Sequence, residues 1–381
     1  MSSASDHAVL RTQAAVIRGP NNVKVEDILL DPPAANELLV KIERVGLCRS
    51  DWHALVGDTK IAMPSILGHE ASGVVESIGP GIQDIGVGDH VSICWHPHCG
   101  ECTYCSNGEH SLCLEGSRIP LGPQMDGTFR RHTPSGEAIG AFCMTGAFAK
   151  HTVVHRASVI KVDSSVPFDI AALCSCCVPA GYGAATSLAR ERRLGESDAV
   201  LVIGTGGDGI NIVQGLRAAG IGAIIAADAS PLKRELAPRF GATHVIDWTE
   251  PGAADKVRRI TNGLGVRALF LATPAVVLDD ATLALVASGG DVVVTALSRQ
   301  PQPSAAFAFA PLVRRHIRMS FVGYGGRSMR DTVPEAIEAA MRGSIDVAGL
   351  ITKRYKLDDI LQGYKDLDDG KILRGMVHPW D

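Results

Sequence analysis

The chain has 381 residues, of which 46% are hydrophobic and 20% charged, and its net charge is −4. This composition is ordinary for a soluble chain with room for two domains, and it argues against nucleic-acid binding, which needs clustered basic residues. No apolar run reaches the ~18 residues of a membrane helix, and the first residues lack the pattern of a secretory signal. Ten cysteines in such a chain favour metal binding over disulfides. We therefore expect a cytoplasmic protein that contacts neither nucleic acid nor membrane.

Residues up to about 180 carry short β-like runs separated by turns rich in glycine and proline. Such runs occupy residues 38–44, 73–78 and 90–93, and Gly-Pro-Gly at 79–81 follows the second of them. Glycine and proline between apolar runs of this length are typical of strand connections. The pattern predicts a compact, mostly β domain in this part of the chain.

Four closely spaced cysteines follow these runs in the sequence C-G-E-C-T-Y-C-S-N-G-E-H-S-L-C. They are Cys99, Cys102, Cys105 and Cys113. Zinc takes four thiolates in a closed tetrahedral site, which leaves no position for substrate. The pattern therefore predicts a structural zinc, and it prompts a search for a second, open zinc site.

From about residue 199 the chain alternates continuous apolar runs with helix-like stretches. The runs occupy residues 199–203, 223–227, 244–248, 268–273, 291–297 and 318–324. Fully apolar strands separated by helices indicate a parallel sheet covered on both faces, so we predict a six-stranded, doubly wound α/β domain. After about residue 324, a helix-like 331–343 and a strand-like 372–378 are expected to rejoin the first domain.

A glycine-rich loop follows the first of these apolar runs and precedes a helix-like stretch. It reads G-T-G-G-D-G and contains Gly204, Gly206, Gly207, Asp208 and Gly209. Backbone N–H groups at a helix N-terminus can bind a pyrophosphate, although a tight turn without a nucleotide remains the alternative. An acid placed where Asp228 ends the next run binds the ribose hydroxyls, which favours NAD over NADP.

Asp208 is unusual in this loop, because an apolar residue is common at its position. An acid near the nicotinamide ring would favour the cationic, oxidised cofactor. The alternative, which we prefer, is that the side chain faces solvent or caps the helix.

Three separate segments contain further metal-binding residues. G-L-C-R-S-D-W-H contains Cys48, L-G-H-E contains His69, and L-C-S-C-C contains three thiols, at 174, 176 and 177. Two thiolates and one imidazole leave one zinc position open, as in a catalytic site. Spacing alone does not decide which of the three thiols takes part.

The order and spacing of these motifs resemble those of the medium-chain, zinc-dependent alcohol dehydrogenases over essentially the whole length. The resemblance implies a GroES-like catalytic domain at residues 1–179 and 324–381 and an NAD-binding Rossmann domain at 180–323. The long interval from Cys113 to Cys176 resembles that of the dimeric members, so a homodimer is expected. The sequence G-I-N-I-V-Q-G at 209–215 also resembles a bacterial branch whose enzymes hold nicotinamide tightly.

The resemblance implies two zinc ions per subunit. Anchoring on Gly-Tyr-Gly at 181–183 selects the third ligand of the catalytic zinc, whose ligands are then Cys48, His69 and Cys176. Ser50 and His53 are implied as a proton relay and Glu70 as a carboxylate behind the metal. Arg49 and Arg374 are implied as pyrophosphate contacts and Lys233 as a helper of Asp228, although each could instead be a solvated surface charge. Ala180 departs from the threonine often found at its position, so one cofactor contact is expected to be absent.

The implied activity is hydride transfer between a zinc-bound alkoxide and NAD, by an alcohol dehydrogenase or carbonyl reductase. We expect an apolar substrate pocket, which favours apolar or aromatic alcohols and aldehydes. Its predicted lining is Trp95, Leu112, Phe142, Cys143 and Leu297.

Two other functions are open at this point. In the first, NAD stays bound and an external acceptor reoxidises it, as the G-I-N-I-V-Q-G likeness and Asp208 suggest. In the second, the chain is a non-catalytic protein on a dehydrogenase fold, which should have lost a zinc ligand or a relay residue. All of those residues are present, which disfavours the second alternative.

Overall fold

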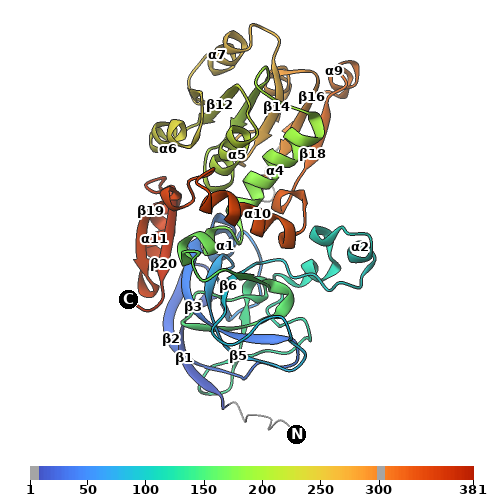
Figure 1. The fold of residues 1–381 in the computed structure, drawn as a ribbon. Coiled ribbons are helices and arrows are strands. Elements are labelled where there is room, and N and C mark those ends of the chain that lie inside the picture. The colour runs from blue at the N-terminus through green and yellow to red at the C-terminus, as the bar shows by residue number, and fades with distance from the viewer. Residues whose placement is uncertain (1–7, 298–304) are drawn as a thin grey trace. The chain divides into compact units, whose positions relative to one another are not determined.

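The chain forms two units, which the computed structural model describes over residues 8–297 and 305–381 (Figure 1). The first unit comprises the residues up to Cys176, then Ser328–Ile337 and Ile351–Asp381. The second comprises Cys177–Arg327 and Glu338–Leu350. Residues 338–350 therefore lie in the second unit, whereas the sequence places them with the first.

The first unit is built mainly from β-strands in two sheets. A closed barrel has the order β1-β2-β7-β8-β4, and a seven-stranded sheet has the order β10-β6-β5-β3-β20-β19, with β9 also paired to β3. The barrel strands are β1 (Leu10–Gly19), β2 (Asn22–Leu30), β7 (Arg131–His132), β8 (Ala138–Ala141) and β4 (Ser65–Ile66). The other strands are β10 (Val159–Val162), β6 (His90–Ile93), β5 (Ala71–Ile78), β3 (Glu37–Leu47), β20 (Arg374–His378), β19 (Ile351–Lys356) and β9 (His151–His155).

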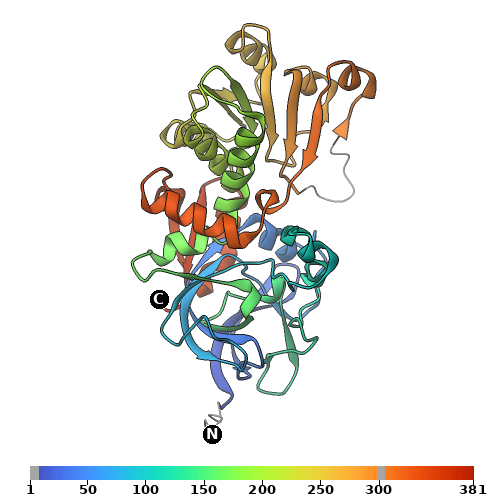
Figure 2. The same ribbon diagram turned by 45° about the vertical axis from the view of Figure 1, so that its right-hand side comes forward.

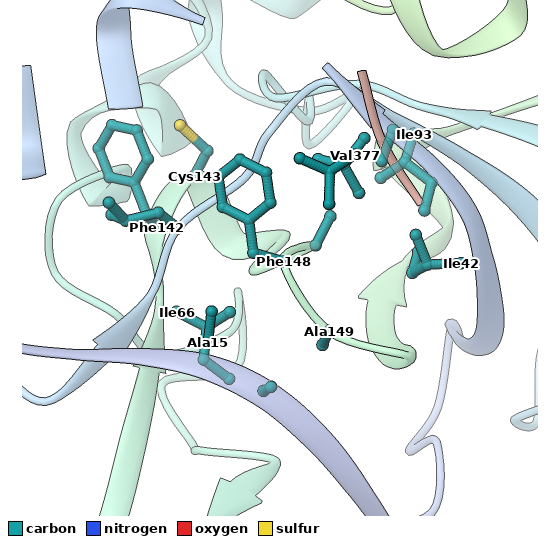
Figure 3. Close-up of a cluster of buried hydrophobic side chains, with 14 of the residues drawn as sticks. Ala15, Ile42, Ile66, Ile93, Phe142, Cys143, Phe148, Ala149 and Val377 are labelled. Carbon is teal, nitrogen blue, oxygen red and sulfur yellow. The ribbon is translucent and has the colours of Figure 1, made fainter. Parts of the chain in front are cut away.

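Apolar side chains from both sheets form one buried cluster in the first unit. Ile42, Ile66 and Ile93 belong to it, together with Phe142 and Phe148 (Figure 3). In β3, the side chains of Leu38, Val40 and Ile42 alternate onto this side, as the period of two in a strand requires. The cluster fixes the ends of the strands and loops that carry the candidate metal ligands.

Short helices connect the strands of the first unit. The α-helices are α1 (Arg49–Leu55), α2 (Thr103–Ser106), α3 (Phe168–Leu173) and α11 (Ile360–Asp368), and α10 (Met329–Met341) passes from the first unit into the second. The 3₁₀ helices are η1 (His110–Leu112), η2 (Leu114–Arg118), η3 (Phe142–Met144), η4 (Arg156–Ser158) and η8 (Leu357–Asp359).

The second unit contains the predicted six-stranded parallel sheet (Figure 2). Its order is β13-β12-β11-β14-β16-β18, so the strand order reverses direction at β11 and β14. Ligands of open α/β sheets bind at such a reversal, beyond the carboxyl ends of the strands. The strands are β13 (His244–Asp247), β12 (Ala223–Asp228), β11 (Ala199–Ile203), β14 (Val266–Leu271), β16 (Val286–Val294) and β18 (Arg318–Phe321).

Helices and a short extra strand pair complete the second unit. Among the described residues, none of the helices combines the length and apolarity that crossing a membrane requires. The α-helices are α4 (Cys177–Arg192), α5 (Gly207–Ala218), α6 (Pro231–Leu236), α7 (Ala253–Ile260), α8 (Asp280–Leu283) and α9 (Phe309–Arg314). The remaining elements are η5 (Ala237–Phe240), η6 (Tyr324–Gly326), η7 (Ala348–Leu350), β15 (Leu278–Asp279) and β17 (Ala305–Ala306).

Candidate active site

Two thiols and one imidazole converge in the first unit from three segments that are far apart in sequence. Cys48 immediately precedes α1, His69 precedes β5, and Cys176 follows α3. The ligand atoms of all three lie within 4.8 Å of one another, and the Cys176 Sγ is 3.4 Å from the His69 Nε2. Among the described residues, no fourth histidine, cysteine or carboxylate belongs to this group. Such a donor set fits a zinc ion with one open position.

A buried carboxylate lies behind the His69 imidazole. The Asp51 Oδ2 is 2.9 Å from the His69 Nδ1, and the Asp51 Oδ1 accepts a hydrogen bond of 2.8 Å from the Gly68 N–H. Asp51 is fully buried. A carboxylate on the far nitrogen fixes the ring orientation and presents the Nε2 to a metal. The sequence motif contains Asp51, but no role was predicted for it.

The same three groups shift one another's pKa values. A hydrogen bond from Cys176, aided by the charge of His69, brings the pKa of the Cys48 thiol well below its usual range. Burial lowers the pKa of His69, but the charges of Asp51 and Cys48 raise it by more, so that it lies well above its usual value. Zinc binds thiolate and neutral imidazole, so metal binding here should release the imidazole proton.

The four predicted cysteines of the structural site also converge. The ligand atoms of Cys99, Cys102, Cys105 and Cys113 lie within 4.8 Å of one another, and the Sγ atoms of Cys99 and Cys113 are 3.7 Å apart. The N–H of Cys99 donates to the Cys113 Sγ, and that of Cys102 to the Cys99 Sγ, each at 3.3 Å. Backbone N–H groups lower the pKa of Cys102 to about 6. Four convergent sulfur donors fit a closed zinc site.

The glycine loop joins β11 to α5 in the second unit. Gly204 has φ +88°, a region that favours glycine, and a Cβ on Gly209 would lie 1.7 Å from the Gly204 carbonyl oxygen. Gly206 caps α5, and Gly207 and Asp208 open its first turn. This is the geometry in which helix N–H groups can receive a pyrophosphate. The half-buried Asp208 lies where a carboxylate complements the helix dipole.

Asp228 ends β12 and holds the neighbouring loop. Its Oδ2 accepts hydrogen bonds from the Thr205 N–H at 2.6 Å and the Thr205 Oγ1 at 3.2 Å, while its Oδ1 accepts one from the Ser230 N–H at 2.8 Å. The Lys233 Nζ is 4.0 Å from the same carboxylate. The structure thus brings Asp228 and Lys233 together next to the glycine loop.

Comparisons with known proteins agree with this geometry. Family models match at residues 34–164 (alcohol dehydrogenase GroES-like domain) and 207–342 (zinc-binding dehydrogenase). The chain is 34% identical to an NDMA-dependent alcohol dehydrogenase from Amycolatopsis methanolica, over 97% of this chain and 99% of the relative. It is 33% identical to alcohol dehydrogenase B from Mycobacterium tuberculosis, over 98% and 99%. A crystal structure of an alcohol dehydrogenase zinc-binding domain protein from Burkholderia ambifaria matches with a TM-score of 0.90 and 26% identity, over 97% and 99%.

The chain belongs to the medium-chain, zinc-dependent alcohol dehydrogenase family. It is therefore an oxidoreductase of the alcohol dehydrogenase type. The predicted combination of a GroES-like domain with a Rossmann-type parallel sheet is confirmed.

The predicted relay residues of this alcohol dehydrogenase lie on α1, next to the first metal ligand. The Ser50 Oγ is 3.9 Å from the Cys48 Sγ, and Ser50 and His53 are three residues apart on the helix, so they share a face. The His53 Nδ1 is 3.0 Å from the Asp58 Oδ2, a partner that the sequence alone did not indicate. Arg49, on the same helix, contacts the Asp368 Oδ1 through its Nη1 at 2.6 Å.

Glu70 and Arg374, for which the resemblance implies separate roles at the metal and at the pyrophosphate, form an ion pair with each other. Both side chains are buried. A Cβ on Gly46 would collide with the Glu70 carboxylate, so the position of Gly46 in β3 must be glycine for the Glu70 side chain to fit. A buried carboxylate needs such a partner, so the Arg374 guanidinium fixes Glu70 next to His69.

Two of the five predicted pocket residues lie near the metal group. The Phe142 ring meets the His69 ring edge-on with centroids 6.0 Å apart, and Phe142 and Cys143 belong to the buried cluster of Figure 3. Burial raises the pKa of the Cys143 thiol. Trp95 packs against the edge of that cluster. By contrast, more than half of Leu112 and of Leu297 is exposed, so neither lies in a buried lining within its own unit.

Replacement of Asp51 by asparagine should weaken zinc binding at the three-ligand site by about 10–100-fold, the usual effect of removing a carboxylate behind a metal-bound histidine. Chelator competition, followed by zinc release, measures this. Asp366→Asn is the matched control, because Asp366 is also a buried carboxylate but hydrogen-bonds Tyr355 at 2.8 Å instead of a metal-binding group. Equal zinc affinity in the Asp51 variant and the wild type would show that Asp51 does not orient His69.

Proposed function

We propose that this protein is a zinc-dependent NAD(H) alcohol dehydrogenase or carbonyl reductase. The observation that carries the proposal is the buried group of Cys48, His69 and Cys176, which offers three ligands and leaves one position open. The glycine loop with Asp228 in the second unit supports a dinucleotide as the hydride carrier. The first unit is thus assigned to zinc and the second to NAD.

The residues of the first unit would bind the two zinc ions and orient their ligands. When bound, zinc acts as a Lewis acid on the alcohol oxygen and oxidised nicotinamide accepts the hydride of the carbinol carbon. Cys48, His69 and Cys176 would hold the metal, with Asp51 orienting His69. The Cys99–Cys113 site would hold a second zinc with a structural role.

The hydroxyl proton of the alcohol needs a route to solvent. Ser50 can accept it first, and His53 can pass it outward, because a neutral imidazole accepts a proton on one ring nitrogen and can release one from the other. The contact between the His53 Nδ1 and Asp58 orients the imidazole so that the Nε2 is available to the relay. The products are then a carbonyl compound, NADH and one proton.

NAD rather than NADP is the proposed cofactor, because the Asp228 carboxylate would repel a 2′-phosphate. Lys233 would assist at the adenosine ribose, and Arg49 and Arg374 would contact the pyrophosphate.

A panel of alcohols and aldehydes, followed at the nicotinamide absorbance with NAD and with NADP, tests the activity and the cofactor together. Turnover with NAD on apolar or aromatic alcohols is expected. The proposal would be contradicted if no compound of the panel were turned over, either with added NAD or NADP or by nicotinamide already bound to the protein.

Replacement of Asp228 by asparagine should lower the preference for NAD over NADP by about tenfold, which corresponds to about 1.4 kcal/mol. The amide oxygen can still accept from the Thr205 N–H, so that contact with the glycine loop is kept, while the negative charge and the hydrogen bond from the Ser230 N–H are lost. Fluorescence titration with NADH and NADPH measures the two dissociation constants. Asp198→Asn is the matched control. The Asp198 Oδ2 also accepts a hydrogen bond from a backbone N–H, that of Gly195, at 2.8 Å, but Asp198 lies at the opposite end of the strands. An unchanged preference would exclude Asp228 as the discriminating group.

A second candidate cycle keeps NAD permanently bound and uses an external acceptor to reoxidise it. The relative named as NDMA-dependent favours it. Protein purified without added cofactor should then release stoichiometric nicotinamide on denaturation, and should turn over with alcohol and NDMA alone. Purified protein that carries no nicotinamide and turns over only with added NAD would remove this candidate.

A homodimer is also proposed. The edge strand β18 exposes most of the Phe321 side chain, and α9 exposes most of Phe309 and Val313. Large exposed apolar side chains on an edge strand, and on the helix that precedes it in the chain, are typical of an interaction surface.

A cytoplasmic location is proposed because all ten cysteines lie in the described residues and none forms a disulfide, and because both metal groups require reduced thiols.

A further inference from the structure

Helix α5 carries two polar side chains that are almost completely buried. Asn211 is 0% and Gln214 is 2% exposed. A buried amide is costly unless its hydrogen bonds are made, and an apolar residue would serve equally well if packing were the only requirement. The partners of these two amides therefore indicate what they do.

The two amides form a continuous chain of hydrogen bonds within the second unit. The Asp346 N–H donates to the Gln214 Oε1 at 2.6 Å, the Gln214 Nε2 donates to the Asn211 Oδ1 at 3.0 Å, and the Asn211 Nδ2 donates to the Gly207 carbonyl oxygen at 2.8 Å. This series of hydrogen bonds runs from the segment Glu338–Leu350 to Gly207, which is the first residue of α5 and part of the glycine loop.

Each link of this chain fixes the orientation of the next. The N–H of Asp346 can only donate, so it selects the oxygen of the Gln214 amide, whose nitrogen then faces Asn211. The Asn211 oxygen receives that nitrogen, and its own nitrogen must face the Gly207 carbonyl. Asp346 is itself held, since its Oδ1 accepts from the Gly349 N–H at 2.7 Å and its Oδ2 from the Arg239 Nη2 at 2.6 Å.

The last link acts on the peptide group between Gly207 and Asp208. A peptide group is planar, so a hydrogen bond that fixes the Gly207 C=O also fixes the direction of the Asp208 N–H. That N–H lies in the first turn of α5, the part of a helix whose N–H groups point toward a bound anion. Helix α4 confines the same turn, because a Cβ on Gly181 would lie 2.2 Å from the Asp208 carbonyl oxygen.

We propose that Asn211 and Gln214 are positioning residues that hold the N–H groups at the start of α5 in the orientation that binds the pyrophosphate of the cofactor. The inference rests on the proposed use of a nicotinamide dinucleotide. It goes beyond that proposal because it assigns part of the affinity for the pyrophosphate to two buried residues that act through the Gly207 carbonyl group and are not themselves proposed to bind the phosphate.

The test uses three ligands on the full-length protein from which any bound nucleotide has been removed. NADH and ADP-ribose contain the pyrophosphate, whereas adenosine contains only the part next to Asp228. In Asn211→Leu and Gln214→Met, the dissociation constants of NADH and ADP-ribose should rise about tenfold, as the loss of one buried hydrogen bond and the stranding of its partner predict. The dissociation constant of adenosine should stay within about twofold of the wild-type value.

Thr261→Val is the matched control, because the Thr261 Oγ1 also donates to a helix carbonyl four residues back, that of Val257, at 3.0 Å, and is buried in the same unit. It should leave all three constants unchanged. Unchanged NADH affinity in Gln214→Met, which retains the shape of the side chain, would overturn the inference, as would an equal rise for adenosine. Wild-type protein that binds none of the three ligands would instead overturn the proposed function, and the inference with it.

Discussion

Replacement of His69 by alanine is expected to abolish alcohol turnover and to remove one zinc ion, while the four-cysteine zinc stays bound. His69 supplies one of three converging ligands, and Asp51 holds it in place from behind at 2.9 Å. Lewis-acid activation of an alcohol is worth several kcal/mol, and each 1.36 kcal/mol is tenfold in rate, so the rate should fall by about a thousandfold or more. Zinc content per chain and turnover of the best alcohol of the panel measure the two effects.

Cys174→Ala is the control for this experiment. Cys174 is a buried thiol only two residues from Cys176, yet it is not part of the converging group. It should retain both zinc ions and activity within a few-fold, which also tests the choice of Cys176 among the three neighbouring thiols. Full activity in the His69 variant, or loss of zinc in the Cys174 variant, would contradict the assignment of the ligands.

Replacement of Cys102 by alanine is expected to destabilise the folded protein, in contrast to the replacement of His69, which is expected to affect catalysis. The segment around α2, η1 and η2 consists of short helices, and the Leu112 and Leu114 side chains are more than half exposed. Little apolar burial holds it together, so its order should depend on the metal. In zinc-finger peptides the apparent free energy of zinc binding is on the order of 10 kcal/mol, and it acts as folding free energy. Loss of one of four ligands should therefore release the zinc and lower the melting temperature.

Limited proteolysis locates this effect, because cleavage should concentrate between residues 95 and 118. Ser106→Ala is the matched control, since Ser106 lies on α2 within the same segment but is not a ligand. It should leave zinc content and the cleavage pattern as in the wild type. A Cys102 variant with two zinc ions and an unchanged melting temperature would show that the four cysteines do not form a structural metal site.

The sequence predicts the second unit well because its pattern is local. Six continuous apolar runs separated by helices can satisfy their backbone hydrogen bonds and bury both faces only as a covered parallel sheet. The six strands of that sheet, β11, β12, β13, β14, β16 and β18, coincide with those runs. The β runs at 38–44, 73–78 and 90–93 likewise lie in β3, β5 and β6. These strands are recognisable from their side-chain period alone.

The metal groups are also predictable, because each ligand set has a characteristic composition and order. Cys48, His69 and Cys176 come together in space although more than one hundred residues separate the last two. What the sequence does not reveal is the partner of a buried charge or amide. The pairing of Glu70 with Arg374, and the link from Gln214 to Asp346, join segments whose proximity depends on the tertiary fold.

The path of the chain between the two units shows the same limit. Residues 338–350 contain no motif that assigns them to either unit, and their place is set by contacts such as those of Asp346 with Gln214 and Arg239. Exposure is equally non-local. Leu112 and Leu297 are apolar in sequence, which favours a pocket lining, but more than half of each side chain is exposed in the part of the chain that the structure describes.

The proposed reaction at this site is hydride transfer from an alcohol to nicotinamide. The most direct test mixes the enzyme and oxidised NAD with an alcohol that carries deuterium on the carbinol carbon. The reduced nicotinamide, bound or free, is then recovered, and its mass is measured by mass spectrometry. One deuterium is expected in the reduced nicotinamide of the wild type, and no reduced nicotinamide above background in His69→Ala. Reduced nicotinamide without deuterium, or equal transfer in the two proteins, would contradict the proposed reaction.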